Sequence, residues 1–423
     1  MFVLRRLSLL VLLLSAVFAV APAVAQQGDP GAVVVADVRG PLDQRSLDFL
    51  EDVIRNEDAQ LIVLKIDNPG IASGDFDSLA TVIAESQTPV AAWVGPDGAV
   101  AYGGVGQLLQ KVAVSGAAQG ARIGYLSPTV AGDDVTLVAD DEAWHLRDDE
   151  VVVTSVASTE LVTIVQPTIG QFIAALDGMD VDTATGSVLL ETAEQITTDT
   201  GSTVTVSSVE VRFLKPTLLT RFLRLGARPD AAFFFLVAGL AVAAFEFYAA
   251  GAGIAAAVAA LSLFLAGYGF ATLPMNWWAV VAAILGIGLY TWDFQRHELG
   301  VRSILGTILM FFGGLAFMSG GSQINTSFWA VALTVIGIML FYLLAMTTIV
   351  RSRFGTPTIG REHLIGSVGI VESPLDPDGV VVVDGARWRA RARRAGVDAG
   401  EEIEVLAVEG ITLQVARGEI AKS

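Results

Sequence analysis

The chain has 423 residues, of which 53% are hydrophobic, and its 44 acidic residues against 26 basic ones give a formal net charge of −18 at pH 7. It contains no cysteine, which excludes disulfides and thiolate chemistry. The acidic charge is concentrated in residues 29–211, which hold 29 Asp and Glu against 7 Lys and Arg. Such a surface disfavours nucleic acid and anionic lipid as partners of this segment, and we expect a solvated acidic face without a metal or cofactor.

The N-terminus has the pattern of a secretory signal peptide. Arg5 and Arg6 precede an apolar stretch over residues 7–20, and small residues at 23–25 form a cleavage pattern. We expect cleavage before Gln26, so that the acidic segment is exported.

The first half of the exported segment predicts an α/β fold. Short apolar, β-branched runs at residues 32–36, 61–66 and 89–94 are typical of buried strands. Residues 42–56 and 76–86 have helical spacing, and a glycine-rich turn after the third strand leads into a helix through Leu108 and Leu109. This alternation indicates a parallel sheet with right-handed crossovers. Further along, residues 135–138, 142–146 and 150–153 predict short strands between acidic turns.

The glycine-rich turn at residues 96–106 reads Pro-Asp-Gly-Ala-Val-Ala-Tyr-Gly-Gly-Val-Gly. It resembles the active-site turn of membrane-bound ClpP-class serine proteases, the NfeD family, in which a Pro-Gly-Ala lead-in is followed by Ser, Ala and Gly. The resemblance implies a ClpP/crotonase fold and places Gly103 at the position of the nucleophilic serine, followed by Gly104 and Val105.

Two further parts of the implied site also depart from the family. The oxyanion turn corresponds to Pro69-Gly70-Ile71, which keeps one glycine and replaces the second with a β-branched residue. The general base of the family is a lysine, but residues 26–214 contain only Lys65 and Lys111, neither of which is placed like that lysine. We therefore expect a degenerate site and assign no catalytic residue.

An active serine protease remains the alternative. Four serines lie near the implied site, and His145 is the only histidine of the exported segment, so a Ser-His pair is conceivable. No nucleophile-elbow motif surrounds any of these serines. They are Ser73, Ser78, Ser115 and Ser127.

Five apolar stretches predict transmembrane helices at residues 231–247, 254–273, 277–292, 304–318 and 328–349. An odd number of spans places the two flanking regions on opposite sides. Arg351 and Arg353 after the last span, with Arg296 and Arg302 between the third and fourth, favour a cytoplasmic C-terminus. The basic segment at 212–230 opposes this orientation, and we interpret it as an amphipathic helix in the outer headgroup layer. It carries Arg212, Lys215, Arg221, Arg224 and Arg228.

Few polar residues lie in the predicted spans, which disfavours a transporter or channel. Glu246 lies near the end of the first span, where a carboxylate reaching the headgroups is expected. Residues 293–298 include acids and a histidine, but we expect a solvated loop and no metal site. Glycine and alanine dominate the second span and favour close packing within the bundle or between copies.

The C-terminal segment predicts a small all-β barrel of OB type. Its five β-rich runs are residues 365–371, 380–383, 387–391, 402–408 and 412–416. The motifs at 360–366, 376–379, 383–391 and 408–413 resemble the NfeD C-terminal barrel.

An arginine cluster on this barrel needs an interpretation. With Phe354 and Trp388 as the only aromatic residues of the segment, stacking platforms for nucleic acid are lacking. We expect a solvated face or a patch that contacts anionic lipid, and no nucleic acid. The cluster comprises Arg387, Arg389, Arg391, Arg393 and Arg394.

The predicted organisation is a signal peptide (1–25), an exported degenerate ClpP-like domain (26–211), a basic juxtamembrane segment (212–230), a five-helix membrane block (231–350) and an OB-type barrel (351–423). The resemblance implies a partnership with SPFH proteins, the stomatin- and flotillin-like scaffolds. We expect a non-catalytic scaffold or quality-control factor, able to self-associate, with an active ClpP-class endopeptidase as the alternative.

Overall fold

The computed structural model describes residues 31–132, 141–155, 159–197, 203–207, 209–249, 253–295, 300–319, 323–346, 362–393 and 396–418. The predicted signal peptide and the predicted strand at 135–138 lie outside these residues. So do Arg296, Arg351, Arg353, Arg394 and the end of the fifth predicted span. By its internal contacts the chain forms two units, Met1–Ala244 with Gly253–Ile338, and Phe245–Ala252 with Met339–Ser423.

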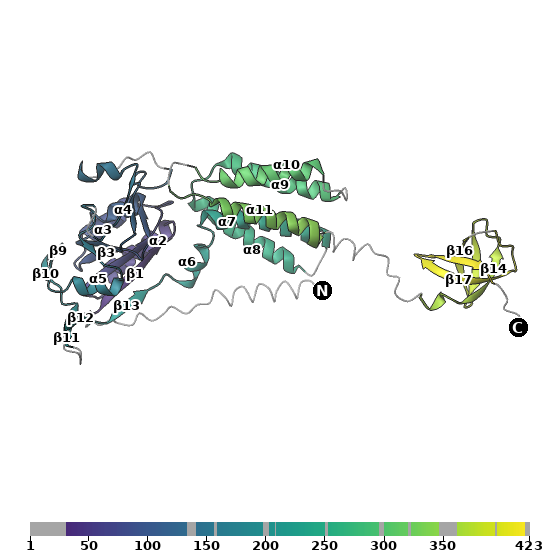
Figure 1. Ribbon diagram of the computed structural model, residues 1–423, viewed down its shortest axis with the longest axis horizontal. Coiled ribbons are helices and arrows are strands. Elements are labelled where there is room, and N and C mark those ends of the chain that lie inside the picture. The colour runs from purple at the N-terminus through teal and green to yellow at the C-terminus, as the bar shows by residue number, and fades with distance from the viewer. Residues whose placement is uncertain are drawn as a thin grey trace. The chain divides into compact units, whose positions relative to one another are not determined.

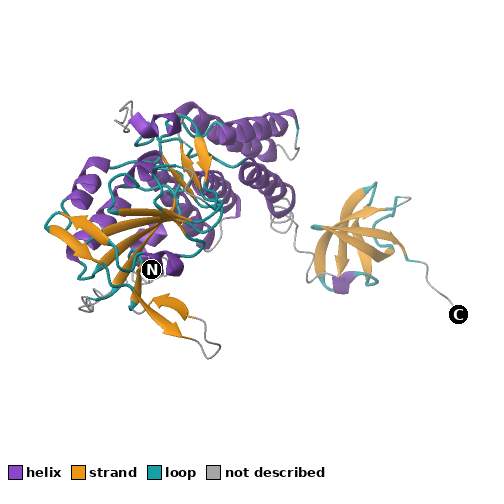
Figure 2. Ribbon diagram, turned by 60° about the vertical axis from the view of Figure 1, so that its left-hand side comes forward, coloured by secondary structure: helices purple, strands orange, loops and turns teal. Residues whose placement is uncertain are grey.

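A six-stranded parallel sheet organises the α/β region (Figures 1 and 2). Its strands are β1 (Val33–Arg39), β2 (Leu61–Asp67), β3 (Val90–Val94), β5 (Val114–Ala117), β8 (Ile164–Val165) and β13 (Val211–Leu214), in the order β13-β1-β2-β3-β5-β8. The three predicted strands and both predicted helices are confirmed, the helices as α2 (Gln44–Asn56) and α3 (Phe76–Ala84). Because both faces of the central strands are covered, β1, β2 and β3 are mostly apolar, and the charged residues Lys65 and Asp67 of β2 are only partly buried.

The two faces of the sheet pack against different helices. Along β1, Val34 and Ala36 point to the layer formed by α2, α3 and α4 (Gly103–Leu108). Val33 and Val35 point to the opposite layer, which contains α5 (Ile169–Ala175). Because side chains alternate along a strand, each strand contributes residues to two separate apolar cores.

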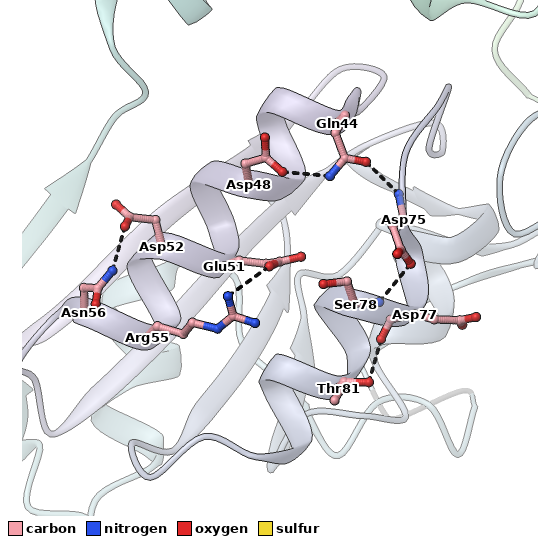
Figure 3. A network of polar contacts seen from close by, with 10 residues as sticks. All are labelled: Gln44, Asp48, Glu51, Asp52, Arg55, Asn56, Asp75, Asp77, Ser78 and Thr81. Atoms are coloured by element: carbon pink, nitrogen blue, oxygen red, sulfur yellow. Dashed lines mark hydrogen bonds and ion pairs between the residues drawn. The ribbon is translucent and has the colours of Figure 1, made fainter.

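Polar contacts fix the starts of α2 and α3 to each other (Figure 3). Asp75 caps α3 by accepting a hydrogen bond from the Ser78 N–H at 3.0 Å. The Gln44 side chain accepts from the Asp75 N–H at 2.9 Å and donates to Asp48 at 2.7 Å. The acidic side chains of this network, such as Asp48 and Asp77, lie on the exposed side of the helices, as a solvated acidic face requires.

A smaller sheet begins within the glycine-rich segment 96–106, which forms a turn, then β4 (Val100–Tyr102) and then the start of α4. It contains β4, β6 (Arg122–Gly124) and β7 (Glu150–Val152), so the predicted strand at 150–153 is confirmed. The prediction of a strand at 142–146 is wrong, because Asp141–Leu146 forms a 3-10 helix. Ala143 and Leu146, three residues apart, are buried, whereas Trp144 and His145 are exposed. A repeat of three places one side of such a helix on the core.

The α/β region also contains two hairpins that the sequence analysis did not predict. They are formed by β9 (Asp180–Thr183) with β10 (Gly186–Leu189), and by β11 (Ala193–Thr197) with β12 (Thr203–Ser207).

The prediction of one amphipathic helix over residues 212–230 is wrong, because Arg212 lies in β13 of the parallel sheet and the helix α6 covers only Leu218–Leu223. In the described part of the chain, five apolar helices follow α6. They are α7 (Pro229–Ala249), α8 (Ile254–Thr272), α9 (Trp277–Gln295), α10 (Val301–Leu315) and α11 (Phe328–Leu340), the last continued by a π-helical segment, Phe341–Met346. Among the described residues, α7, α8 and α9 are long and apolar enough to cross a membrane, whereas α10 and α11 are shorter. Three helices are therefore candidate membrane spans, and a crossing of the membrane by five helices stays a prediction.

Helices pack closely both between α9 and α10 and at one position of the second predicted span. A Cβ on Gly286 would lie 2.7 Å from the carbonyl oxygen of Gly306, and a Cβ on Gly306 would lie 2.7 Å from the carbonyl oxygen of Gly286. On α8, Gly269 is equally confined, by Gly226 and Ala232, but Gly267 has nothing within 4 Å. Small residues therefore allow close backbone approach only at certain positions.

Asp293 corrects the expectation of a solvated loop at 293–298, of which residues 296–298 lie outside the described part. The Asp293 side chain is buried in α9. One carboxylate oxygen accepts hydrogen bonds from the N–H groups of Gly300 at 3.0 Å and Ser303 at 2.9 Å. The other accepts from Arg302 at 3.3 Å. Asp293 thus caps the start of α10 and fixes the turn between two helices. Glu246 lies half-buried in α7.

The C-terminal barrel is closed, as predicted. Its strands are β14 (Val368–Ser373), β15 (Asp378–Val383), β16 (Ala386–Ala392), β17 (Glu402–Glu409) and β18 (Thr412–Arg417), in the order β14-β15-β16-β18-β17. The arginines of β16 are exposed, but two of them pair with acids: Arg387 contacts Glu372, and Arg391 binds Asp378 at 2.7 and 3.0 Å. The hydrogen bonds from Arg391 hold the pKa of Asp378 below its usual range. The cluster is therefore partly neutralised and is less basic than the sequence predicts.

Candidate functional site

Gly103 begins α4 at the end of β4, in a conformation that favours glycine. Its φ is +57°, in the left-handed region. A Cβ at this position would lie 3.0 Å from the carbonyl oxygen of Pro128 and 3.6 Å from that of Thr129. The place where a serine side chain would start is therefore bordered by the backbone of residues 128–129.

The first N–H groups of α4 are used by the same segment of the chain. The Gly103 N–H donates to the Tyr125 carbonyl at 3.0 Å, and the Gly104 N–H donates to the Thr129 carbonyl at 2.9 Å. An N–H directly after a nucleophile is the kind of donor that stabilises an oxyanion. Here the Gly104 N–H already donates its hydrogen bond to the carbonyl oxygen of Thr129.

The predicted oxyanion turn lies beside Gly103. Gly70 has a φ of +136°, and its Cα lies 3.7 Å from the position of a Cβ on Gly103. The Gly70 N–H donates to the buried side chain of Asn68 at 2.7 Å. This donor is therefore also engaged within the protein.

Ile71 occupies space that the family motif would need. It is 1% exposed, and its Cδ1 would lie 2.8 Å from a Cβ on Gly104, while the Thr129 oxygen would lie 2.6 Å from that Cβ. Ile71 also forms a parallel bridge with Val130, and the Ala131 N–H donates a hydrogen bond to the Ile71 carbonyl at 2.8 Å. Residues 129–131 thus lie along the turn as a segment of the chain itself, with an isolated bridge at Val130, and we call this segment the internal strand.

Gln107 holds the internal strand from the other side. Its side-chain amide, 2% exposed on α4, donates to the Leu126 carbonyl at 2.5 Å and to the Thr129 hydroxyl at 3.3 Å. A buried side chain with two hydrogen bonds to one segment restricts the movement of that segment.

The structure does not bring the candidate lysines, serines and histidine of the alternative protease site together. Lys65 lies half-buried within β2, and Lys111 is exposed after α4. His145 is exposed, and among the described residues no hydrogen bond joins it to a serine. Ser115 instead lies within hydrogen-bonding distance of Thr163, 3.0 Å between the hydroxyl oxygens. The described residues also contain no group of three or more His, Asp or Glu that could hold a metal ion.

Tyr102 precedes Gly103 and is the titratable side chain nearest to it in the chain. Its hydroxyl donates to Glu150, and its ring packs edge-on against Tyr125 at 5.4 Å between centroids. Burial and the hydrogen bond to Glu150 raise the pKa of Tyr102 far above its usual range. A phenol held in this way stays protonated at neutral pH and does not serve as a base.

A residue of the helical region also packs against Gly70. Ile324, between α10 and α11, is 1% exposed, and its Cδ1 would lie 3.6 Å from a Cβ on Gly70. Pro274, between α8 and α9, would lie 3.3 Å from a Cβ on Gly132, next to the internal strand. Neither contact could be predicted, because both join segments far apart in the sequence.

Replacing Ile324 with valine is expected to destabilise the protein by about 1 kcal/mol, because it removes the methyl group that lies over Gly70. The measurement is the thermal midpoint in detergent. Ile336→Val, at a position that is 47% exposed on α11, is the matched control and should leave the midpoint unchanged. Equal effects of the two substitutions would mean that Ile324 is not packed against the turn.

A buried polar cluster joins α8 to the start of α2. The Tyr268 hydroxyl donates to Asp43, a side chain that is 1% exposed. Asp43 caps α2 by accepting from the N–H of Ser46 at 3.0 Å and from its hydroxyl at 2.5 Å. Arg224 donates to the Ser46 hydroxyl at 3.0 Å, and burial lowers the pKa of Arg224. The α/β region and the helical region are thus held together beside the site.

Comparison with known proteins gives matches over both later regions. Residues 230–347 match the NfeD integral membrane domain, and residues 361–417 match the NfeD-like C-terminal, partner-binding domain. A relative over most of the chain is the membrane-bound protease PH1510 of Pyrococcus horikoshii. It is 22% identical over 425 residues, which cover 91% of this chain and 93% of that protein.

Solved structures also resemble parts of the chain. One is the C-terminal domain of the stomatin operon partner protein 1510-C from P. horikoshii, with 35% identity, coverage of 14% of this chain and 97% of that one, and a TM-score of 0.14. Another is the 1510-N membrane protease specific for a stomatin homolog from the same organism, with 18% identity, coverage of 46% and 97%, and a TM-score of 0.35.

These matches follow the order of regions along the chain. The parallel sheet with its glycine-rich turn precedes the residues that match the NfeD membrane domain, and the closed barrel contains those that match the NfeD C-terminal domain. The chain therefore contains an NfeD integral membrane domain and an NfeD-like C-terminal domain, and a parallel α/β region precedes them.

Proposed function

We propose that this protein is a non-catalytic membrane scaffold, or assembly and quality-control factor, that acts with a stomatin-like SPFH protein. The observation that carries the proposal is the internal strand: the carbonyl oxygen of Thr129 accepts the hydrogen bond of the Gly104 N–H, where a substrate carbonyl would need it. A site whose N–H donors are already engaged by other groups of the protein cannot stabilise an oxyanion without first breaking these bonds.

The absence of the family's nucleophile supports the same proposal. Gly103 offers no side chain, and a serine there would begin 3.0 Å from the Pro128 oxygen. With Ile71 packed against α4, and with neither Lys65 nor Lys111 placed like the family's base, three parts of the site differ from the family motif. We propose that the ClpP-like region has been retained for binding and assembly.

The partner is proposed from the C-terminal region. Residues 361–417 match a partner-binding domain, and the relatives from P. horikoshii are described as a stomatin operon partner and as a protease specific for a stomatin homolog. We extend this partner class to the present chain. In the proposed topology the signal peptide exports the α/β region, five helices cross the membrane, and the barrel faces the cytoplasm.

An active serine endopeptidase remains the second candidate, because the relative that covers 91% of this chain is named a membrane-bound protease. One experiment separates the two functions. The full-length protein in detergent is treated with a fluorophosphonate probe and, separately, with an unstructured hydrophobic peptide. We expect neither labelling nor cleavage. A labelled serine together with cleavage would establish the protease and end the scaffold proposal.

A second experiment tests the partner. The tagged protein is expressed in its native membranes, solubilised in mild detergent and captured. We expect a stomatin-like protein in the captured fraction, and recovery no higher than from mock-tagged membranes would contradict the partnership.

A further inference from the structure

One row of side chains crosses the outer face of the barrel from acid to base. Glu402 on β17 lies directly opposite Ile370 on β14, Ile370 lies opposite Val382 on β15, and Val382 lies opposite Arg387 on β16. Ile370 is 55% exposed, and both charged residues are exposed. The row therefore reads acidic, apolar, apolar, basic across four strands.

Two neighbouring pairs, in different rows, each show one half of this pattern. Val368, which is 62% exposed, lies opposite Glu404, and the half-buried Val380 lies opposite Arg389. We call this surface the charge-edged face. It consists of Glu402 and Glu404, then Val368, Ile370, Val380 and Val382, then Arg387 and Arg389.

The width of the charge-edged face fits one helix. Neighbouring strands lie about 4.8 Å apart, so the acidic and basic edges are separated by about 14 Å. An α-helix with its side chains is about 10–12 Å wide. A helix lying along the apolar centre would reach both edges with its flanking side chains.

The barrel itself argues against other ways of docking. Each strand pairs with two neighbours, so an added β-strand would find no open sheet edge. A membrane surface or a nucleic acid carries one sign of charge and would be repelled by Glu402 and Glu404. A partner with both signs of charge, separated by an apolar stripe, satisfies both edges.

Arg387, on the basic edge, can leave its ion pair with Glu372 to bind a carboxylate of the partner protein. Arg387 pairs with Glu372, but its side chain is 76% exposed, and an ion pair so exposed contributes little to stability. Beside it lies a depression of about 500 Å³, lined by Glu372, Ser373, Val380, Arg387, Trp388 and Arg389. A side chain of the partner could enter this depression while a carboxylate of the partner forms an ion pair with Arg387.

We propose that the charge-edged face binds an amphipathic helix of the partner protein, with its apolar stripe bordered by basic residues on one side and acidic residues on the other. The proposal rests on the function proposed above and names the surface and the helix chemistry through which the partner is held.

The first test uses the full-length protein in phosphatidylcholine nanodiscs and three fluorescent helical peptides with an identical Leu/Ala stripe. Their edges carry Lys and Glu, Lys only, or Glu only. We expect the mixed peptide to bind at least about fivefold more tightly than the other two, because only it matches both edges. Empty nanodiscs give the background. Equal binding of all three peptides would overturn the proposal.

Substitutions then locate the binding surface. Ile370→Asp is expected to weaken binding of the mixed peptide by about tenfold or more, because it places a charge in the apolar centre. Ile411→Asp is the matched control: Ile411 is 65% exposed, lies between β17 and β18, and should not affect binding. Replacing Glu402 and Glu404 with lysine should shift the preference to the all-Glu peptide. An unaltered preference would contradict the proposal.

Capture from native membranes separates this inference from the proposed function. If Ile370→Asp recovers the stomatin-like protein as well as the unsubstituted chain, the inference fails while the function stands. If neither recovers it, the proposed partnership fails. If the unsubstituted protein forms oligomers that Ile370→Asp dissociates, the occupant is a second copy, and the inference of a partner helix is wrong.

Discussion

Restoring the family motif by Gly103→Ser together with Gly104→Ala is expected to destabilise the protein and to produce no protease. A non-glycine residue in the left-handed conformation of Gly103 costs about 1–2 kcal/mol. A Cβ on Gly104 would lie 2.6 Å from the Thr129 oxygen and 2.8 Å from Ile71, and such overpacking costs about 1–3 kcal/mol. For a domain of this size, we expect the thermal midpoint to fall by about 5–15 °C.

The control for this pair is Gly98→Ser. Gly98 has a similar φ of +78°, but nothing lies within 4 Å of its would-be Cβ. It should show the conformational cost alone, about 1–2 kcal/mol. Thermal unfolding in detergent and fluorophosphonate labelling are measured on all variants. A motif-restored protein that is stable and whose introduced serine is labelled would show that the internal strand leaves the site readily.

Replacing Asp43 with alanine is expected to cost about 3–7 kcal/mol, because three groups lose their acceptor at once. The N-cap of α2 contributes about 1 kcal/mol, and each buried hydroxyl left unpaired costs a further 1–3 kcal/mol or so. These hydroxyls belong to Ser46 and Tyr268. Asp75→Ala is the matched control, since Asp75 caps α3 with the same geometry but is exposed, and it should cost only about 1 kcal/mol.

Tyr268→Phe tests whether the link between the two regions is direct. Combined with Asp43→Ala, it should add less destabilisation than it causes alone, with a coupling of about 1 kcal/mol, since the two residues share one hydrogen bond. Thermal midpoints of the four proteins complete the cycle. Additive effects would mean that Tyr268 and Asp43 do not interact in the folded protein.

Much of the fold follows from local pattern. The strands at 32–36, 61–66 and 89–94 are short apolar runs bounded by turns, and burial on both faces leaves no other element for them to form. The five barrel strands were predictable because alternating side chains and Gly or Asp turns recur along the segment. The strand predicted at 142–146 failed because five residues are too few to separate a repeat of two from a repeat of three.

The degenerate site that we propose was predictable only in the side chains that it lacks. The glycine at 103 and the isoleucine at 71 are visible in the sequence, and the resemblance tells which residues they replace. Nothing in residues 127–131 indicates that they lie along the oxyanion turn, because that position is set by hydrogen bonds to Ile71, Gly104 and Gln107. Asp293 was misjudged for the same reason, since its burial depends on a turn formed with Gly300 and Ser303.

The sequence by itself determined the parallel α/β region, the apolar helices, the closed barrel and the absence of a nucleophile at Gly103, because each depends on residue type and spacing along the chain. The tertiary structure decided what fills the site instead: the carbonyl of Thr129 on the donor of Gly104, and Ile324 over Gly70. These contacts join residues separated by tens to hundreds of positions. Their energies depend on how closely the backbones approach, which no local pattern encodes.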